Sequence, residues 1–215
     1  MITCEWMSVE NFSCEDVMDL LDQRTRDRVK SCIRAQKAKE IALGALMLQT
    51  LAGRMLNIKP SDVLIKYSSE GRPYLDSSEL FLNLSHCDGK CVALVSDIRA
   101  GCDLQSVRPF GGEAVRAFFS EKAFHHITKS DDPDYEMTRI WCIREALYKF
   151  SGAKLPDIGL FLKKVSASDR AAFSKEYGVW LFEESIDDLM LAVVTEKAGH
   201  TDSLEIKRFQ DDIMM

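Results

Sequence analysis

Apolar side chains recur every three or four residues between Arg24 and Asn57. This spacing is the period of an amphipathic helix, so it predicts a helix over the range with at most one break. The helix should end before Pro60, because proline disfavours helical geometry in the residue that precedes it. The recurring apolar positions are Val29, Ile33, Ile41, Ala45, Leu48, Ala52 and Met55.

Four short apolar runs follow this helix and predict strands, because runs of this length between turn residues are typical of sheets. Asp88-Gly89 separates two of the runs and predicts a tight hairpin, since both residues tolerate the backbone geometry that such turns require. Gly71-Arg72-Pro73 predicts another turn. The predicted strands are residues 63–67, 80–84, 91–96 and about 101–105.

The rest of the chain repeats this order, with helices first and strands afterwards. Gly152 follows the last predicted helix as a C-cap. Two successive groups of helix and strands predict an α+β fold of two similar halves, residues 1–107 and 108–215. A doubly wound α/β fold would need helices that alternate with single strands, which the pattern lacks. The predicted helices are residues 113–119, 121–128 and 135–151, and the predicted strands are residues 160–165, 179–183, 189–195 and 204–209.

Composition narrows the class of protein. The 215 residues are 46% hydrophobic and 29% charged, which is typical of a globular protein. No apolar run reaches the roughly 20 residues that span a bilayer, and the N-terminus lacks the pattern of a secretory signal. We therefore expect a cytoplasmic protein with no membrane partner. The net charge of −6 argues against a general nucleic-acid binder.

Basic residues nevertheless gather near the start of the long helix. Such a run is either the solvated face of an amphipathic helix or a local site for anions. The run consists of Arg24, Arg26, Arg28, Lys30, Arg34, Lys37 and Lys39.

Seven cysteines are present without any C-x-x-C pair, so we expect reduced, partly buried thiols. His86-Cys87 and Cys91 resemble half of a zinc site, but a matching second pair of ligands is missing.

Three polar motifs carry the candidate chemistry. Asn83-Leu84-Ser85-His86 offers a hydroxyl and an imidazole to phosphate oxygens. The second motif places a carboxylate on an apolar strand and consists of Gly101-Cys102-Asp103-Leu104-Gln105. The third motif is the helix from Trp141 to Lys149, in which Trp141, Glu145 and Lys149 lie on one face because they are four residues apart. Each motif alone has an ordinary explanation: a solvated acid, a surface Glu–Lys pair, or a common dipeptide.

Serine-hydrolase chemistry is disfavoured for Ser85 and His86. Adjacent residues of a strand point to opposite faces, and no G-x-S-x-G sequence surrounds the serine.

Taken in order, the motifs resemble those of the 4′-phosphopantetheinyl transferase superfamily, in its double-length, surfactin-synthetase-activator (Sfp) type. The family shows G-K-P, N-x-S-H, G-[IVC]-D-[IL]-E, F-S-x-x-E and W-x-x-K-E-A-x-x-K in this order. The resemblance covers about two thirds of the chain, from Arg24 to Gly152. The counterparts in this chain are Gly71-Arg72-Pro73, Asn83 to His86, Gly101 to Gln105, Phe119 to Ala123, and Trp141 to Lys149.

The resemblance implies an enzyme that transfers the 4′-phosphopantetheine group of coenzyme A to a serine of an acyl or peptidyl carrier protein, releasing 3′,5′-ADP. It implies that Asp103 and Glu145, with Gln105 in place of a glutamate, hold Mg²⁺. Asp103, Glu145 and Lys149 would be catalytic, with Glu145 as the general base to test. The implied coenzyme contacts are Arg28, Arg72, Pro73, Ser85, His86 and Lys149.

Chain length adds an expectation about architecture. The short branch of the family forms trimers with a site between subunits, so a double-length chain is expected to act as a monomer with its site in the cleft between its halves. Asp103 and Glu145 would then approach from opposite halves. We also expect carrier recognition by the interleaved basic and aromatic side chains of Arg108, Arg116, Phe118 and Lys122.

The chain departs from the family pattern at Gln105, at Ala123 in place of an acid, and at Arg144 in place of lysine. Two other readings therefore stay open: a non-catalytic descendant that binds coenzyme A or a carrier, and an unrelated α+β interaction module.

Overall fold

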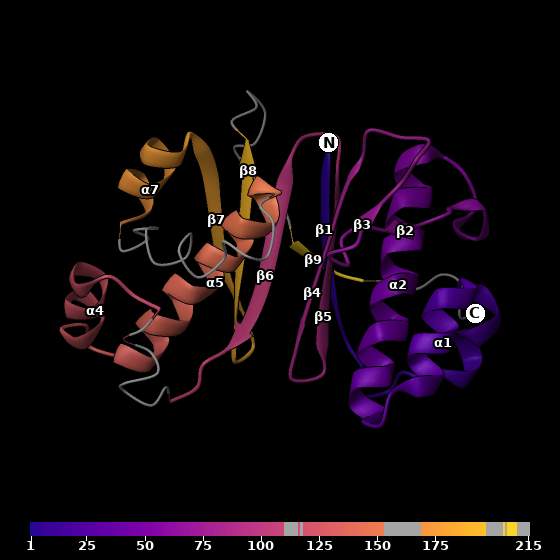
Figure 1. Ribbon diagram of the computed structural model, residues 1–215, viewed down its shortest axis with the longest axis horizontal. Helices are drawn as coiled ribbons and strands as arrows, with labels where there is room; N and C mark the ends of the chain where they lie inside the picture. Colours follow the sequence, from indigo (N-terminus) through magenta and orange to yellow (C-terminus); the bar gives the residue numbers. More distant parts are fainter. Residues whose placement is uncertain (110–115, 117, 153–168, 197–203, 205, 210–215) are drawn as a thin grey trace. The chain divides into compact units, whose positions relative to one another are not determined.

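The computed structural model describes residues 1–109, 116, 118–152, 169–196, 204 and 206–209. The chain forms two compact units: Met1–Ile98 together with Asp202–Met215, and Arg99–Thr201. Each unit packs helices on a sheet, so the predicted α+β class is confirmed (Figure 1). The strand predicted at 160–165 and most of the helix predicted at 113–119 lie outside the described residues.

The first unit is built on a four-stranded sheet in the order β4-β5-β1-β9. β1 pairs antiparallel with β5 and parallel with β9. A separate pair of two-residue strands, β2 and β3, lies in the same unit. The bounds are β1 Ile2–Ser8, β2 Lys66–Tyr67, β3 Pro73–Tyr74, β4 Phe81–Cys87, β5 Lys90–Ser96 and β9 Ile206–Arg208, with short 3-10 helices η1 Glu15–Leu20 and η2 Pro60–Asp62.

The long predicted helix is confirmed, with its single break. It forms α1 (Gln23–Ser31), whose N-cap Asp22 accepts a hydrogen bond from the Thr25 amide, and α2 (Ala35–Leu56). α2 ends at Asn57, which adopts the left-handed conformation at φ 55°. Its apolar face packs on the sheet, chiefly against β5, and forms the core of the unit (Figure 1).

The hairpin predicted at Asp88-Gly89 joins β4 to β5. Asp88 has φ 46° and Gly89 has φ 77°, and positive φ at both central residues is the requirement of the favoured two-residue hairpin turn. The strands pair with His86 opposite Cys91.

The second unit has a three-stranded antiparallel sheet in the order β6-β8-β7. Its longest helix, α5, packs on β6 and β8 and ends at Gly152, which has φ 71° as the C-cap prediction requires. The bounds are β6 Ala100–Ser106, β7 Val179–Ile186, β8 Leu189–Glu196, α4 Glu121–Thr128, α5 Pro133–Ser151 and α7 Arg170–Tyr177.

The expected division of the chain at residues 107 and 108 is not the one that the structure gives. β6 belongs to the second unit, because its hydrogen-bonded neighbour is β8 and the helix that covers it is α5. Asp103 and Glu145 therefore lie in the same unit and do not come from opposite halves. The last described strand, β9, belongs to the first unit.

Among the described residues, no helix has the length and apolar character needed to cross a membrane.

Candidate functional site

A glycine sets how closely α5 approaches β6. A side chain at Gly101 would place its Cβ 2.4 Å from the Ala146 carbonyl oxygen and 2.4 Å from the Phe150 amide nitrogen. Because both obstacles are backbone atoms, only glycine allows this separation. Asp103 and Gln105 follow at two-residue spacing, on the same face of β6. The glycine of the G-C-D-L-Q motif thus brings Asp103 to the helix that carries Glu145 and Lys149.

Asp103 lies at the centre of the polar contacts on this face and is only 3% exposed. Its Oδ1 accepts a 2.7 Å hydrogen bond from Lys149 Nζ, which also donates to the Cys102 carbonyl at 3.0 Å. Its Oδ2 accepts a 2.7 Å hydrogen bond from the Gln105 side-chain amide. A buried carboxylate requires such partners, since an isolated buried charge is strongly unfavourable.

The second carboxylate, Glu145, lies one helical turn before Lys149 on α5. Burial and the negative charge of Asp103 raise the pKa of Glu145 to about 7, although Lys149 lowers it. Burial alone would lower the pKa of Lys149, but the charge and hydrogen bond of Asp103, together with Cys102 and Glu145, outweigh it, so the pKa is raised. Lys149 therefore stays a cation at neutral pH, while Glu145 can bind or release a proton there.

These residues fit a divalent cation with oxygen ligands. Two carboxylates share one partly buried site, and the Gln105 amide oxygen is a third candidate ligand, since its nitrogen donates to Asp103. Mg²⁺ is typically held by one or two carboxylates, with the remaining positions filled by phosphate and water. No cluster of three or more histidine, cysteine, aspartate or glutamate side chains suited to a metal occurs in the described part of the chain. The two carboxylates and the Gln105 amide oxygen are protein oxygens in the small number that Mg²⁺ takes.

Arg144 anchors the segment that precedes α4. Its side chain is fully buried, and Nη1 donates a 3.0 Å hydrogen bond to the Phe118 carbonyl. The guanidinium lies 4.4 Å from the Phe119 ring centroid, and burial lowers the pKa of Arg144 to about 10. Phe118 packs edge-on against Trp141 at 5.7 Å between ring centroids. The arginine that replaces the family lysine is therefore a structural anchor beside Glu145.

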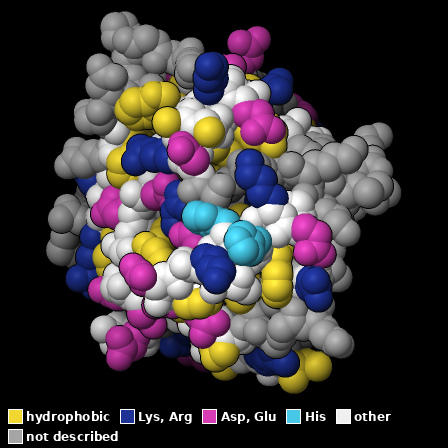
Figure 2. Space-filling view, turned by 90° about the vertical axis from the view of Figure 1, so that its left-hand side faces the viewer, with side chains coloured by type: hydrophobic (Ala, Val, Ile, Leu, Met, Phe, Trp, Pro, Cys, Tyr) yellow, Lys and Arg dark blue, Asp and Glu magenta, His cyan; other side chains and the backbone are white. Residues whose placement is uncertain are grey.

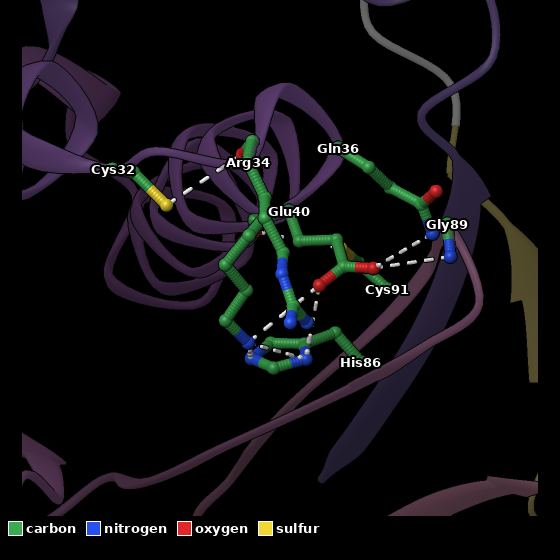
Figure 3. A network of polar contacts seen from close by, with 8 residues as sticks. Cys32, Arg34, Gln36, Glu40, His86, Gly89 and Cys91 are labelled. Atoms are coloured by element: carbon green, nitrogen blue, oxygen red, sulfur yellow. Dashed lines mark hydrogen bonds and ion pairs between the residues drawn. The ribbon is translucent and has the colours of Figure 1, made fainter.

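A second polar cluster lies in the first unit, where β4 meets the start of α2 (Figure 3). Lys37 Nζ lies 3.1 Å from His86 Nδ1 and 2.8 Å from Nε2. Glu40 Oε2 is 3.4 Å from His86 Nδ1 and 3.6 Å from Lys37 Nζ. Part of the predicted basic run thus faces the predicted phosphate-binding histidine.

Ser85 does not share this face of β4. Leu84 contacts Gly44 of α2 and His86 contacts Lys37, so alternation along the strand turns Ser85 to the opposite face, where it is buried. The structure therefore places Ser85 and His86 of the N-L-S-H motif on opposite faces of β4.

The remaining predicted coenzyme contacts lie around the β2–β3 pair. Gly71 has φ 81°, and the Arg72 amide donates to the Ser68 hydroxyl, which closes the predicted turn before Pro73. Arg28 is exposed on α1. Burial raises the pKa of Tyr67, and the positive charge of the nearby Arg28 opposes that rise. Tyr67 in turn pairs with Pro73 between β2 and β3. The first unit therefore gathers these basic residues and the turn near one another.

Sequence reasoning missed the part played by Glu40. It is the one acid between Lys37 and the apolar body of α2, and its spacing of three residues from Lys37 was a usable signal. Because Glu40 directly follows the basic run, the sequence pattern alone did not indicate its role.

Comparison with known proteins gives two successive matches to family models. A model described as 4′-phosphopantetheinyl transferase, N-terminal, matches residues 5–99, and one described as 4′-phosphopantetheinyl transferase superfamily matches residues 99–193. Residue 99 is also the first residue of the second compact unit.

Individual relatives carry the same name. 4′-Phosphopantetheinyl transferase HetI of Nostoc sp. is 28% identical over 136 residues, which cover 58% of this chain and 57% of the relative. 4′-Phosphopantetheinyl transferase psf-1 of Bacillus pumilus is 22% identical over 177 residues, covering 79% and 76%. The L-aminoadipate-semialdehyde dehydrogenase-phosphopantetheinyl transferase of Saccharomyces cerevisiae is 32% identical over 100 residues, covering 40% and 36%.

The chain thus spans less than two thirds of the length of the Nostoc and yeast relatives that it matches. The two family models together extend over residues 5–193, and their boundary agrees with the division of the structure. The chain belongs to the 4′-phosphopantetheinyl transferase superfamily.

Proposed function

We propose that this protein transfers the 4′-phosphopantetheine group of coenzyme A to a serine of an acyl or peptidyl carrier protein, releasing 3′,5′-ADP, with Mg²⁺ as cofactor. The observation that carries the proposal is the shared site of Asp103, Glu145 and Lys149 on one face of the second unit. Relatives named as 4′-phosphopantetheinyl transferases support it. We infer that the enzyme acts as a monomer in the cytoplasm.

Asp103 and Glu145, with the Gln105 amide oxygen, would hold the metal. When bound, Mg²⁺ would neutralise charge on the pyrophosphate and stabilise the transfer of the phosphoryl group. Lys149, held by Asp103 at 2.7 Å, supplies a fixed positive charge to the same phosphates.

Glu145 is the residue suited to proton transfer. Its carboxylate lies beside Asp103 and Lys149 and would accept the proton of the carrier serine, directly or through water. Lys149 is unsuited to that role, because its raised pKa keeps it protonated. The nucleophile belongs to the carrier, so this chain need not supply one.

The coenzyme would be held by basic and turn residues of the first unit. His86 and Lys37 present nitrogen donors at the end of β4, and Arg28, Arg72 and Pro73 lie around the β2–β3 turn. An acidic protein that binds a polyanion needs such a local basic surface.

Carrier recognition is proposed for the exposed residues before and on α4. Arg116 lies 5.4 Å from the Phe124 ring centroid and pairs with Glu121, and Phe118 is 44% exposed. Figure 2 shows that basic, acidic and apolar side chains are interleaved on the face of the second unit that carries the histidines of α4. Such a mixed surface suits an acidic partner with a small apolar contact. Arg108 and Lys122 complete the proposed surface.

One observation favours a second function, a non-catalytic protein that binds coenzyme A or a carrier. Gln105 stands where the family has glutamate, and its amide nitrogen occupies Asp103 Oδ2. The site thus has one negative charge fewer for a metal.

Intact-mass spectrometry separates the two functions. An apo-carrier is incubated with the protein, coenzyme A and Mg²⁺, and a gain of about 340 Da on one serine, the mass of the covalent arm, is expected. If the protein binds coenzyme A but no apo-carrier of a panel gains mass, the result would refute transfer and support the non-catalytic function. Absence of both would refute the proposal.

A further inference from the structure

α4 is a short helix that depends on its neighbours for its position. Its eight residues bury two apolar side chains, Ala123 and Ile127, in the core of the second unit. α5 supplies much of that core and packs beside α4 (Figure 1). A helix of this length is not stable alone in water. Specific contacts with α5 therefore decide which way its exposed face points.

Polar contacts from α5 hold α4 near both of its ends. Just before α4 begins, the Arg144 guanidinium donates to the Phe118 carbonyl at 3.0 Å. Near its other end, His126 Nε2 lies 3.0 Å from Glu136 Oε1. Because an ionised carboxylate can only accept, the imidazole nitrogen donates this hydrogen bond. The direction of α4 thus depends on the contact between His126 and Glu136.

Glu136 is itself held by a network that extends to β7. Its Oε1 also accepts a 3.0 Å hydrogen bond from Arg139 Nη1, one turn later on α5. Arg139 Nε lies 2.6 Å from Glu183 Oε1, and Nη2 donates to Oε2 at 3.1 Å. The side chains of Glu136, Arg139 and Glu183 are 13%, 15% and 14% exposed. His126 is therefore the exposed end of a largely buried network that joins three elements.

The charges of the buried part explain why it holds an imidazole. Burial acts to lower the pKa of Arg139, but its contacts with Glu183 and Glu136 outweigh burial and raise it, so the guanidinium stays charged. Two carboxylates and one guanidinium then leave one negative charge. Such a charge is costly away from water unless a donor meets it. The His126 N–H is the donor that α4 supplies.

The helix that this contact orients carries part of the proposed carrier surface. Lys122 is exposed and lies one turn before His126 on α4. Arg116 lies 5.4 Å from the Phe124 ring centroid and pairs with Glu121. Since both of these partners belong to α4, a change in the direction of the helix moves Arg116 and Lys122 together. Complementarity to an acidic partner depends on where such cations lie.

We propose that Glu136 is a positioning residue for carrier recognition, which fixes α4 through His126 and so directs the basic side chains that meet the carrier. Arg139 and Glu183 hold Glu136 in place. The inference rests on the proposed function for the identity of the partner. Glu136 is itself largely buried, so its effect on the carrier is indirect.

The sign of the effect of Glu136→Gln separates positioning from simple electrostatics. The substitution removes a negative charge near a surface that meets an acidic partner, so charge alone would strengthen binding. Loss of the fixed helix should instead weaken it. Calorimetry with an apo-carrier should show a Kd about 3- to 10-fold higher, as for loss of part of one charge-assisted contact. The KM for the carrier should rise similarly, with kcat and the KM for coenzyme A unchanged within about twofold.

Two neighbouring acids of β7 form a matched pair that keeps the test decisive if Glu136→Gln folds poorly. Glu183 contacts Arg139, whereas Glu184 points to the other face of the strand and is exposed. Glu183→Gln should weaken carrier binding. Glu184→Gln removes the same charge and should not weaken it. Thermal unfolding confirms that each variant is folded.

His126→Ala tests whether the histidine acts through Glu136 or touches the carrier itself. If the two residues act as one contact, the double variant should bind the carrier no more weakly than the weaker single variant. Hydrogen exchange of the amides of residues 121–128 should be faster in both single variants than in the unmodified protein.

Two results would overturn the inference. One is unchanged or tighter carrier binding by folded Glu136→Gln, or by Glu183→Gln where the first variant does not fold. The other is additive losses in the double variant, which would mean that His126 contacts the carrier directly. Both leave the proposed transfer reaction intact.

Failure of the proposed reaction has a different signature. If no apo-carrier gains mass, but Glu136→Gln still weakens carrier binding, the result would refute transfer and support the positioning role. If the unmodified protein binds no apo-carrier, both the proposed partner and the positioning role are refuted.

Discussion

Gly101→Ala should loosen the candidate catalytic site without touching any of its side chains. The new Cβ would meet the Ala146 oxygen and the Phe150 nitrogen at 2.4 Å, whereas ordinary contacts begin at 3.4 Å. α5 must therefore move about 1 Å from β6 to restore normal contact. This shift separates Asp103 from Lys149 and Glu145.

The expected effect is large for activity and moderate for stability. Overpacking of this kind costs about 1–3 kcal/mol, which lowers the unfolding midpoint by about 2–12 °C in a protein of this size. A displacement of about 1 Å at a catalytic site costs about 100-fold in rate. Thermal unfolding and transfer kinetics at saturating coenzyme A and carrier measure the two effects.

Gly44→Ala is the matched control. Its Cβ would meet Leu84 Cδ2 at 2.7 Å, but this obstacle is the end of a flexible side chain, and the glycine lies inside helix α2. The gain in helix propensity of about 1 kcal/mol offsets the local crowding, so both stability and kcat should stay close to those of the unmodified protein. A Gly101→Ala variant as active as Gly44→Ala would refute the argument that close packing of α5 on β6 builds the site.

Three further predictions concern protons, metal and carrier. Burial and the charge of Asp103 raise the pKa of Glu145 to about 7, so the folded protein binds the proton of this carboxyl more tightly than the unfolded chain does. In the presence of EDTA, the free energy of unfolding should therefore fall as pH rises from about 4.5 to 7. Glu145→Gln should remove that loss in thermal unfolding; the same slope in both proteins would contradict the assignment. Removing divalent cations with EDTA should abolish transfer while leaving the protein folded by circular dichroism, and added Mg²⁺ should restore it; full activity in EDTA would refute the metal site. Reversing Arg116 and Lys122 to glutamate should raise KM for the carrier and leave KM for coenzyme A unchanged, because the pair is proposed to face an acidic partner; unchanged carrier kinetics would refute that surface.

Most elements with strong periodicity could be predicted from the sequence. The helix over residues 121–128 and the C-cap at Gly152 agree with the structure, since local capping and turn geometry fix them. β1 was not predicted, because Ile2–Ser8 mixes apolar and polar residues and becomes a strand only through its pairing with β5. α7 was also missed.

The boundary between the units depends on long-range pairing that no local pattern reveals. β6 follows β5 closely in sequence, and the predicted division placed both strands in the first half, residues 1–107. Its partner β8 is about 90 residues away, as the pairing of Asp103 with Ala192 shows. Similarly, the motif residues of the site could be identified from sequence, but the burial of Glu40 and its contact with the Gly89 amide required the fold.

The transfer rate of Asp103→Ala tests the central claim most directly. Intact-mass kinetics with an accepted apo-carrier, coenzyme A and Mg²⁺ should show at least about a 100-fold loss, as expected when a preorganised electrostatic group is removed. Asp131→Ala, an exposed acid of the same unit, should transfer at the unmodified rate. Full transfer by folded Asp103→Ala would contradict the assignment of the site on β6 and α5.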